Sequence, residues 1–287
     1  MIVIRIGFIG AGKVGFSFGR YLHDKGIQVS GYYSKNPNSS REAAAFTNTK
    51  FYLSSEELVE NSDAIFVTTP DSEIPKVWET LKELSIKDKL ICHCSGALSS
   101  EIFSDISKLG AYSYSLHPMF ALSDKYNSYK KFNEAFFTLE GDALCMEKVI
   151  NLLKQLGNSY KVINKEDKSL YHLAAVMSSN LVVGLVNCGF NYLNMCGFEE
   201  KEALAALKPL ILNNINCILE EGTIKSLTGP LERGDLSTIK AHLNVIPKKD
   251  EELYKNCTKN LISIAENKNP NRNYNEIQEY LEGKGNI

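Results

Sequence analysis

Six residues near the start of the chain form a pattern typical of phosphate binding. The sequence Gly10-Ala11-Gly12-Lys13-Val14-Gly15 spells G-x-G-x-x-G, directly after an apolar run and at the opening of an amphipathic one. In that context the first glycine permits a tight turn, the second lets the backbone approach a pyrophosphate, and the third lets helix and strand pack closely. The helix N-terminus also offers free N–H groups to phosphates. The pattern predicts dinucleotide binding, and a glycine turn without a ligand is the alternative. The residues expected at the cofactor are Gly10, Gly12, Lys13, Val14 and Gly15.

The residues after the second apolar run indicate which dinucleotide binds. Enzymes that use NAD usually place an acidic residue about 20 positions after the glycine loop, where it binds the ribose hydroxyls. This chain has no acid there, because the run ends in Tyr33-Ser34-Lys35-Asn36. Ser34 and Lys35, with Arg41 as a further candidate, could hold a 2′-phosphate through charge-assisted hydrogen bonds. The sequence therefore favours NADP over NAD, although a solvated loop lysine is the ordinary alternative for Lys35.

Two later loops also follow apolar runs. Thr68-Thr69-Pro70-Asp71 ends the third clear run, and Ser95-Gly96 ends the next. In open α/β sheets ligands bind outside the carboxyl ends of the strands. We therefore expect Thr69, Pro70, Ser95 and Gly96 to line the nicotinamide half of the cofactor site. Asp71 has another possible role, since Asp71-Ser72-Glu73 is also a good helix start.

The elements that must position these loops alternate along the first half of the chain. Strands at this spacing, separated by amphipathic helices, predict a parallel sheet with helical crossovers. The expected strands are Ile4–Ile9, Ile27–Tyr33, Ala64–Thr69, Lys89–Cys94, Ala111–Leu116, Phe136–Leu139 and a short one near Tyr160–Ile163. The expected helices are Val14–Asp24, Arg41–Phe46, Ile74–Leu84, Ser100–Lys108 and 142–156.

The second half changes character after Asn164, because no convincing strand follows. Glycine and proline residues mark the ends of helical segments there. The predicted helices are Lys165–Cys196, Glu199–Glu221, Asp235–Val245 and Lys248–Asn267. We therefore predict two domains: a doubly wound Rossmann domain over residues 1–164 and an all-helical domain over residues 165–287.

Composition narrows the function classes. The chain has 287 residues, 44% of them hydrophobic, which suits a globular protein with a good core. A formal charge of −2 gives no electrostatic case for nucleic acid. The seven cysteines are odd in number and scattered, which favours reduced thiols and a cytoplasmic location. We expect no metal site at Cys92-His93-Cys94, since His93 on a strand would point away from both thiols.

We expect neither a targeting segment nor a membrane span. A signal peptide needs a basic start and an apolar run before a cleavage site, whereas Met1 to Ile9 reads as a core strand running into the glycine loop. The most apolar region, Leu170–Leu193, is interrupted by polar residues and reads as a buried helix. The interruptions are Ser178, Ser179, Asn180, Asn187 and Asn191.

The order of motifs along nearly the whole chain resembles a known family. After the glycine loop come Ser95-Gly96-Ala97-Leu98, Leu116-His117-Pro118-Met119-Phe120, His172-Leu173-Ala174-Ala175-Val176 with Asn180, and Thr228-Gly229-Pro230 with Arg233-Gly234-Asp235. Together they resemble uncharacterised Rossmann-like oxidoreductases with a C-terminal helical domain of unknown function. That family is similar to pyrroline-5-carboxylate reductase, ketopantoate reductase, prephenate dehydrogenase and the β-hydroxyacid dehydrogenases. The resemblance implies a 6-phosphogluconate-dehydrogenase-like fold, a homodimer and NADP-linked redox chemistry.

Two residues are candidates from the likeness to prephenate dehydrogenases. His117-Pro118 resembles their His-Pro, whose histidine contacts the reacting hydroxyl, and Ser95 falls near their active-site serine. Hydride transfer to a carbonyl needs a proton donor for the developing alkoxide, which an imidazole can supply. The structural alternative for His117 is a strand-end histidine that caps a turn before proline.

The β-hydroxyacid dehydrogenases carry Lys-x-x-x-Asn on the first helix of their helical domain. Matching Asn180 to that asparagine puts Val176 where the lysine belongs, so their mechanism does not transfer. Asn180 could still orient the substrate, or it could bridge neighbouring helices. His172 precedes Asn180 by eight residues, so the two share one face of a continuous helix. His172 is thus a second acid/base candidate, and a satisfied core histidine is its alternative.

The loop Thr228–Asp235 contributes the last candidates. Arg233 could bind a substrate carboxylate through its planar fork, or form an ordinary salt bridge. Asp235 is better placed as the N-cap of the following helix than as a catalytic group. The sequence thus predicts an NADP-dependent reductase or dehydrogenase of a small, carboxylate-bearing oxo/hydroxy or imino/amino substrate. The alternatives are a non-catalytic NADP(H)-binding sensor, or a reductase of a different cofactor such as a deazaflavin.

Overall fold

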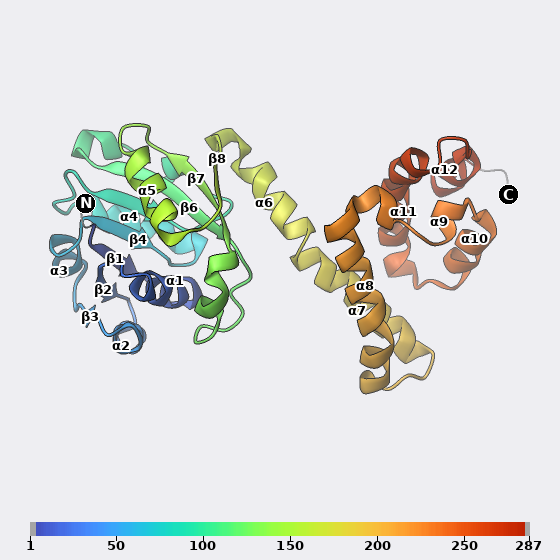
Figure 1. The fold of residues 1–287 in the computed structure, drawn as a ribbon, viewed down its shortest axis with the longest axis horizontal. Coiled ribbons are helices and arrows are strands. Elements are labelled where there is room, and N and C mark those ends of the chain that lie inside the picture. The colour runs from blue at the N-terminus through green and yellow to red at the C-terminus, as the bar shows by residue number, and fades with distance from the viewer. Residues whose placement is uncertain (1–3, 285–287) are drawn as a thin grey trace. The chain divides into compact units, whose positions relative to one another are not determined.

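The computed structural model describes residues 4–284, so Met1–Val3 of the first predicted strand lie outside the described residues. The chain divides into two compact units, 1–182 and 183–287. The first unit contains an eight-stranded sheet in the order β3-β2-β1-β4-β5-β6-β7-β8 (Figure 1). Its strands are β1 (Ile6–Ile9), β2 (Val29–Tyr33), β3 (Lys50–Phe51), β4 (Ala64–Val67), β5 (Leu90–His93), β6 (Tyr112–Met119), β7 (Phe136–Gly141) and β8 (Tyr160–Val162).

The central strands are short apolar runs because helices cover both faces of the sheet. Every residue of β1, β4 and β5 is buried, as expected for strands of a doubly wound sheet. The predicted fold class is confirmed, with one correction. The sheet is not wholly parallel, because β7 runs antiparallel to β6 and pairs His117 with Thr138. The segment between them contains only the 3-10 helix η4 (Ser128–Glu134), whereas a parallel return would need a full crossover.

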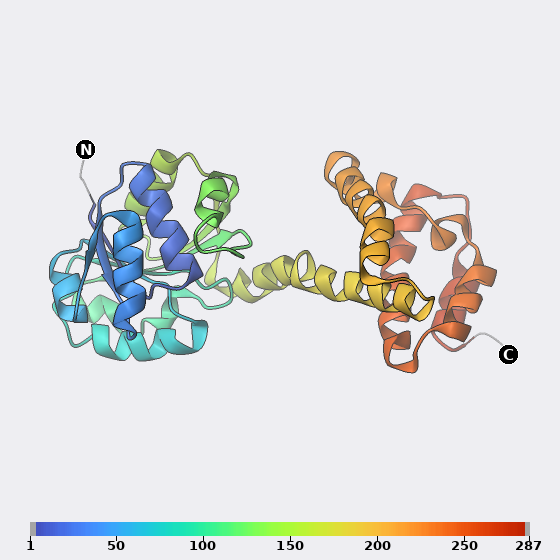
Figure 2. The ribbon, with the colours of Figure 1, turned by 90° about the horizontal axis from the view of Figure 1, so that it is seen from below.

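Two hydrophobic cores lie on opposite faces of this sheet. The helices α1 (Lys13–Asp24), α2 (Pro37–Thr47) and α5 (Met146–Leu156) pack on one face, and α1 and α2 lie side by side (Figure 2). The helices α3 (Ser55–Glu60) and α4 (Ile74–Leu81) cover the other face. The sequence missed α3 and the short β3.

One predicted helix of the first unit is wrong. Residues 100–108 form two 3-10 turns, η2 (Ser100–Ile102) and η3 (Ile106–Leu109), instead of one helix. Asp105 lies between them with a φ of 59°, a left-handed conformation that a continuous α-helix cannot contain. Phe103 still packs against Trp78, with ring centroids 5.4 Å apart, so the segment covers its face of the sheet without a helix.

The single helix predicted over Lys165–Cys196 is also interrupted. It begins as the 3-10 turn η5 (Lys165–Asp167), continues as α6 (Lys168–Met177), and resumes after a break as α7 (Asn180–Met195). At the break the Ser179 hydroxyl donates to the Ala175 carbonyl at 2.6 Å, a bond that competes with regular helix geometry.

This apolar segment is exposed. Residues 165–195 have the length and mean hydropathy (1.6) of a membrane-crossing helix, and none of their most apolar window is buried. That finding is weak evidence by itself, because core helices of soluble proteins pass the same test. The exposure of this segment differs from the buried helix that we predicted. An exposed apolar surface of this kind marks a site of interaction.

The second unit is helical throughout its described residues, 183–284, as predicted. After α7 it contains α8 (Glu200–Ser226), α9 (Pro230–Arg233), α10 (Leu236–Val245), α11 (Lys248–Lys268) and α12 (Asn275–Leu281). The Asp235 carboxylate accepts from the Thr238 N–H at 3.0 Å and caps α10, which confirms the predicted N-cap. The core of this unit is Leu231, Ile239, Ile262, Ala265, Tyr274, Ile277 and Leu281.

Candidate active site

The glycine loop joins β1 to α1 in the geometry that a dinucleotide needs. Gly10 has a φ of 102°, and a Cβ there would come within 2.9 Å of the backbone at Thr68 and Thr69. A Cβ on Gly15 would lie 2.5 Å from the Gly10 carbonyl oxygen. Gly12 occupies the N-cap of α1 without a side-chain cap, so the first-turn N–H groups stay available to an anion.

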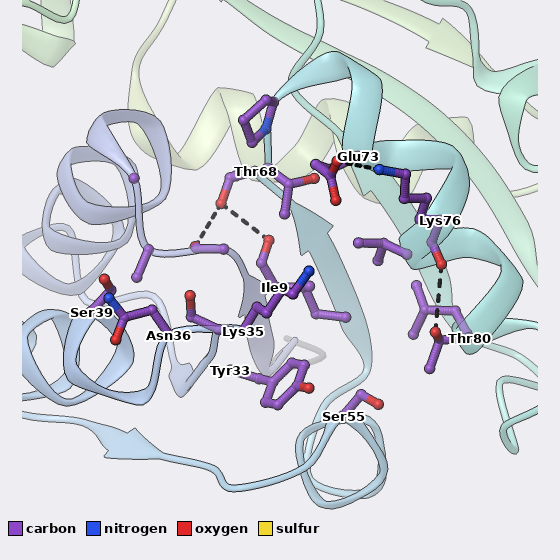
Figure 3. Close-up of a pocket in the computed structure, with 18 residues that line it drawn as sticks. Ile9, Tyr33, Lys35, Asn36, Ser39, Ser55, Thr68, Glu73, Lys76 and Thr80 are labelled. Atoms are coloured by element: carbon purple, nitrogen blue, oxygen red, sulfur yellow. Dashed lines mark hydrogen bonds and ion pairs between the residues drawn. The ribbon is translucent and has the colours of Figure 1, made fainter.

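A cavity of about 620 Å³ adjoins this loop (Figure 3). A Cβ built on Gly12 would meet no atom within 4 Å, so the backbone is open to a ligand there. The lining of the cavity includes the predicted residues Gly10, Gly12, Ser34, Lys35, Thr69 and Pro70. Lys13, Val14 and Gly15 form the first turn of α1 and are not among the lining residues. Arg41 does not line the cavity either, and its guanidinium lies over the Phe51 ring, with the Cζ atom 5.1 Å from the centroid.

These residues fit an adenine dinucleotide with a 2′-phosphate. The open Gly12 backbone and the uncapped helix suit a pyrophosphate, as argued above. Across the cavity Lys35 and the hydroxyls of Ser34 and Ser39 supply donors, and no acidic residue follows β2. Glu73 of the 3-10 turn η1 (Asp71–Glu73) also lines the cavity, on the side of Lys76, and is paired with that lysine at 2.5 Å (Figure 3). The charge balance at this end of the cavity therefore favours an added phosphate.

His117 lies near the end of β6, one strand beyond the Ser95 loop. Its Nδ1 is 2.7 Å from the hydroxyl of Tyr171, which comes from α6. Burial lowers the pKa of His117 to about 4, and the Lys168 charge acts in the same direction. The imidazole is therefore neutral at pH 7, and Tyr171 fixes its orientation.

His117, His172 and Gly96, which the sequence analysis named separately, lie close together in the structure. A Cβ on Gly96 would lie 2.5 Å from His172 Nδ1 and 3.0 Å from His117 Nε2. The two imidazoles meet edge to face, with centroids 6.2 Å apart. His172 Nδ1 is buried and has no hydrogen-bond partner among the described residues. Two ring nitrogens thus lie against the Gly96 backbone and leave no room for a side chain at that position.

Ser95 is engaged in holding its own loop. Its hydroxyl donates to the Asp71 carboxylate at 2.7 Å and accepts from the N–H groups of Ala97 and Leu98. Its backbone N–H donates to His93 Nδ1 at 3.2 Å. Asp71, which the sequence offered as a helix start, thereby links the loop after β4 to the loop after β5. Ser95 has no hydroxyl proton left for a substrate in this arrangement.

Lys168 is the residue that sequence reasoning missed. Its side chain is 2% exposed, and its Nζ donates to the Ser95 carbonyl at 3.0 Å and to the Ser115 hydroxyl at 2.7 Å. Burial lowers its pKa to about 8, and among residues 4–284 no carboxylate pairs with it. A signal was present, because Lys168 and His172 are four residues apart and share a helix face. Anchoring the comparison on Asn180 pointed to Val176 instead.

The remaining candidates, Asn180 and Arg233, come from later elements of the chain. Asn180 starts α7, is exposed, and accepts from the Ser179 hydroxyl at 3.1 Å. The break before it means that His172 and Asn180 do not share one continuous helix face. Arg233 ends α9 in the second unit and is exposed, and its guanidinium has no hydrogen-bond or ion-pair partner among the described residues.

No metal cluster accompanies the site. Among residues 4–284 no three His, Cys, Asp or Glu side chains are grouped closely enough to hold a metal ion. Cys92 belongs to one core, whereas the His93 ring packs against Phe103 of the other, with centroids 5.5 Å apart. The two side chains therefore point to opposite faces of β5, as alternation along a strand predicts.

Two family models match the chain, one on each side of residue 100. Residues 5–95 match the model described as NADP oxidoreductase coenzyme F420-dependent. Residues 135–261 match the model described as Domain of unknown function (DUF2520). The chain thus joins a Rossmann domain of the NADP oxidoreductase type to that second domain, which confirms the resemblance drawn from the motifs. No curated protein matches the chain.

Solved structures share the fold over nearly the whole length. A Thermotoga maritima protein is 27% identical, with a TM-score of 0.73, and the match covers 91% of this chain and 98% of that one. A candidate NADP oxidoreductase from Bacteroides fragilis is 20% identical, with a TM-score of 0.74 and the same two coverages. Plasmodium falciparum pyrroline carboxylate reductase with NADP bound is 12% identical, with a TM-score of 0.61, covering 93% and 97%. The last two likenesses show the fold alone.

Proposed function

We propose that this chain, which joins an NADP-oxidoreductase-type Rossmann domain to a helical domain of unknown function, is an NADP-dependent reductase or dehydrogenase of a small organic substrate. One observation carries the proposal: His117 and His172 converge beside Gly96, after β5 and near the end of β6, on the same carboxyl edge of the sheet as the glycine-loop cavity. Ligands of open α/β sheets bind at those strand ends. A structural histidine pair would have no reason to leave a buried ring nitrogen without a partner.

The cofactor would lie along the glycine loop, with its 2′-phosphate at Ser34 and Lys35. When bound, NADP would supply or accept the hydride. The protein's own part is to orient the substrate and to hold or move its proton. His117 would donate a hydrogen bond to the reacting oxygen or nitrogen, and Lys168 would hold the Ser95 loop against β6.

Further contacts in this proposal come from residues outside the cluster. Asn180 would orient the substrate, and Arg233 would bind its carboxylate. Ser95 acts through the loop and not as a proton donor, because its hydroxyl is already bonded to Asp71. Lys168 does not replace the lysine that is missing at Val176, because it is buried and holds the Ser95 carbonyl beneath the loop.

A homodimer would explain the exposed apolar side chains of α7 and α8. Val183 of α7 and Leu210 and Leu219 of α8 are exposed by 70%, 67% and 78%, and exposed apolar patches mark interaction sites. A second copy would cover this face, and the protein would stay in the cytoplasm. Sedimentation equilibrium checks the point, since a detergent-free monomer, or a protein recovered with vesicles, would contradict it.

The cofactor assignment is tested by titrating the protein with NADPH and with NADH and following nicotinamide fluorescence. NADPH should bind about tenfold or more tightly than NADH, because a lysine–phosphate contact is charge-assisted. Lys35→Ala should remove most of that preference without weakening NADH. The matched control is Arg41→Ala, whose guanidinium stacks on Phe51 outside the cavity and should change neither affinity.

Turnover separates this proposal from a non-catalytic sensor. NADPH depletion would be followed with a panel of 2-oxo acids and cyclic imines. Reduced deazaflavin would be included as an alternative donor, because the matched family model is described as F420-dependent. Tight NADPH binding without turnover by any panel member would favour the sensor. Absence of NADPH binding would remove the oxidoreductase assignment altogether.

A further inference from the structure

Three of the described residues that line the glycine-loop cavity carry a charge. Lys35 follows β2, whereas Glu73 of η1 and Lys76 of α4 lie on the other side of the cavity (Figure 3). The Lys76 ammonium contacts the Glu73 carboxylate at 2.5 Å. The hydrogen bond from Lys76 lowers the pKa of Glu73, and the charge of Lys35 acts in the same direction. Glu73 is therefore an anion within the electrostatic reach of both lysines.

The pair of Glu73 and Lys76 is not required by the helix that carries it. Glu73 occupies the N-cap position of α4, but its side chain makes no cap hydrogen bond. The Glu73 side chain is 37% exposed and that of Lys76 is 70% exposed. An ion pair as exposed as this contributes little to stability. Lys76 can therefore leave Glu73 at small cost.

The charge of a 2′-phosphate exceeds what Lys35 alone can neutralise. A phosphate monoester carries about −1.5 to −2 charges at pH 7, whereas Lys35 supplies a single positive charge. The pyrophosphate does not compete for the lysines, because the glycine loop and the first turn of α1 offer it backbone N–H groups. While the ion pair is closed, Glu73 cancels the charge of Lys76 and would repel an added phosphate. Full neutralisation of that phosphate needs Lys76 as well.

Building on the NADP binding proposed above, we infer that Lys76 is a second ligand of the 2′-phosphate and that Glu73 holds it in reserve while the cavity is empty. When the phosphate enters, Lys76 exchanges the Glu73 carboxylate for a phosphate oxygen, and the exposed Glu73 turns to solvent. NADH brings no anion to this place, so the pair stays closed around it. Lys76 thereby raises the preference for NADPH over NADH, and Glu73 limits it.

The first test replaces the lysine and measures the affinities for NADPH and NADH by nicotinamide fluorescence. Lys76→Met should weaken NADPH binding about fivefold or more, because one charge-assisted contact is lost. NADH affinity should stay unchanged, which also shows that the variant is folded. Calorimetry with 2′,5′-ADP and 5′-AMP repeats the comparison without the nicotinamide. Equal losses for the two members of either nucleotide pair, or no loss for any of them, would overturn the inference.

The second test removes the anion. Glu73→Gln should strengthen NADPH binding by roughly threefold, because it frees Lys76 and removes a like charge from the phosphate. Adding Lys76→Met in the Glu73→Gln background should then weaken NADPH binding again, since the lysine itself contacts the phosphate. If Lys76→Met has no effect in that background, Lys76 serves only to neutralise Glu73, and the inference is wrong.

A second ion pair on the same helix is the matched control. Lys82 contacts Glu79 at 2.5 Å with the same spacing of three residues, and neither residue lines the cavity. Lys82→Met and Glu79→Gln should change neither affinity at about 0.15 M salt, where charges more than roughly 8 Å apart are largely screened. Changes as large as those in the cavity variants would mean that net charge, and not a contact, sets the preference, which would overturn the inference.

The failure of this inference and the failure of the proposed function give different results. If the unmodified protein binds neither NADPH nor 2′,5′-ADP, both are wrong. If NADPH binds tightly and its advantage over NADH depends on Lys35 but not on Lys76, only the inference about Lys76 and Glu73 is wrong. Dependence on both lysines, together with the opposite effect of Glu73→Gln, is the result that we expect.

Discussion

The two units of this protein contain the same side-chain pair in different surroundings. In the first unit His117 Nδ1 lies 2.7 Å from Tyr171, with ring centroids 5.7 Å apart at 81°. In the second unit His242 Nδ1 lies 2.8 Å from Tyr254, with centroids 5.7 Å apart at 89°. His242 is exposed on α10, whereas burial lowers the pKa of His117 to about 4.

The difference shows that a contact alone does not make a site. His117 gains its chemistry from the Gly96 backbone, from a second imidazole and from a buried cation nearby. His242 has its tyrosine and little else: the apolar hollow beside it is lined by Met195, Val245, Ile246 and Pro247 among others. The second pair is therefore a built-in control for the first.

Replacing each histidine should give the largest contrast. His117→Gln should lower turnover by roughly 100- to 1,000-fold, the usual range for one lost hydrogen-bond donor to the reacting atom, because the flexible amide is not held in place as Tyr171 holds the imidazole. His242→Gln should leave turnover within about twofold. Both are measured as kcat/KM with NADPH saturating, and NADPH affinity checks the fold of each variant. Equal losses in the two variants would mean that the pairs are both structural.

Buried His93 should set the acid limit of the first unit. It is 0% exposed, donates through Nε2 to the Ser99 carbonyl at 3.1 Å, and accepts from the Ser95 N–H. Burial lowers its pKa to about 4, below the ordinary 6.5 of the unfolded chain. Between these values the unfolded state binds more protons, so the free energy of unfolding falls as pH drops through the window.

The size of that loss is about 3 kcal/mol between pH 6.5 and 4, from roughly 1.4 kcal/mol for each pKa unit. His93→Gln should flatten this part of the curve, and His242→Gln, at a histidine exposed on α10, is the matched control. Urea unfolding at a series of pH values measures both. Because His117 adds a slope of the same sign, the His93 variant should keep part of the acid sensitivity. An unaltered curve would show that His93 already titrates at its ordinary pKa.

The strands and loops of the first unit could be predicted from the sequence, because residues close together in the chain determine them. The glycine loop and the apolar runs depend on neighbours within a few residues, as does the Asp235 cap in the second unit. The antiparallel direction of β7 could not be predicted, since it depends on the path that the connecting segment takes between β6 and β7. Asp105, whose left-handed backbone interrupts the helix predicted over Ser100–Lys108, cannot be recognised from the periodicity of apolar residues.

The cluster around Gly96 was predicted only in part. His117 and His172 were each named, but their convergence requires the start of α6 to lie beside the end of β6, a contact between residues far apart in sequence. Lys168 was missed because a buried lysine cannot be told from a surface lysine by its type alone. Ser95 was named for catalysis, and its hydrogen bonds instead assign it to the loop. The residue types indicated which chemistry is possible, and only the tertiary contacts show which role each residue can take.

Lysine–tyrosine contacts repeat the comparison at a smaller scale. Lys168 Nζ lies 5.7 Å from the Tyr171 ring and is buried, whereas Lys240 Nζ lies 5.0 Å from the Tyr280 ring and is exposed. Burial lowers the pKa of Lys168 to about 8, below the ordinary 10.5. Between these values the unfolded state binds more protons, so the free energy of unfolding rises with pH across that window.

The rise due to Lys168 should be on the order of 2 kcal/mol, reduced from the full shift by partial screening. Lys168→Met keeps most of the side-chain volume and removes the charge, so this variant should lose the rise between pH 8 and 10.5. Lys240→Met should keep it. Thermal unfolding across that range measures the difference. If both variants show the same pH dependence of unfolding as the unmodified protein, then Lys168 retains an ordinary pKa, and the cation that binds the Ser95 carbonyl is well solvated by the fold. If only Lys168→Met differs, the fold holds a strained cation beneath its candidate site, and the neutral state of His117 follows partly from that charge.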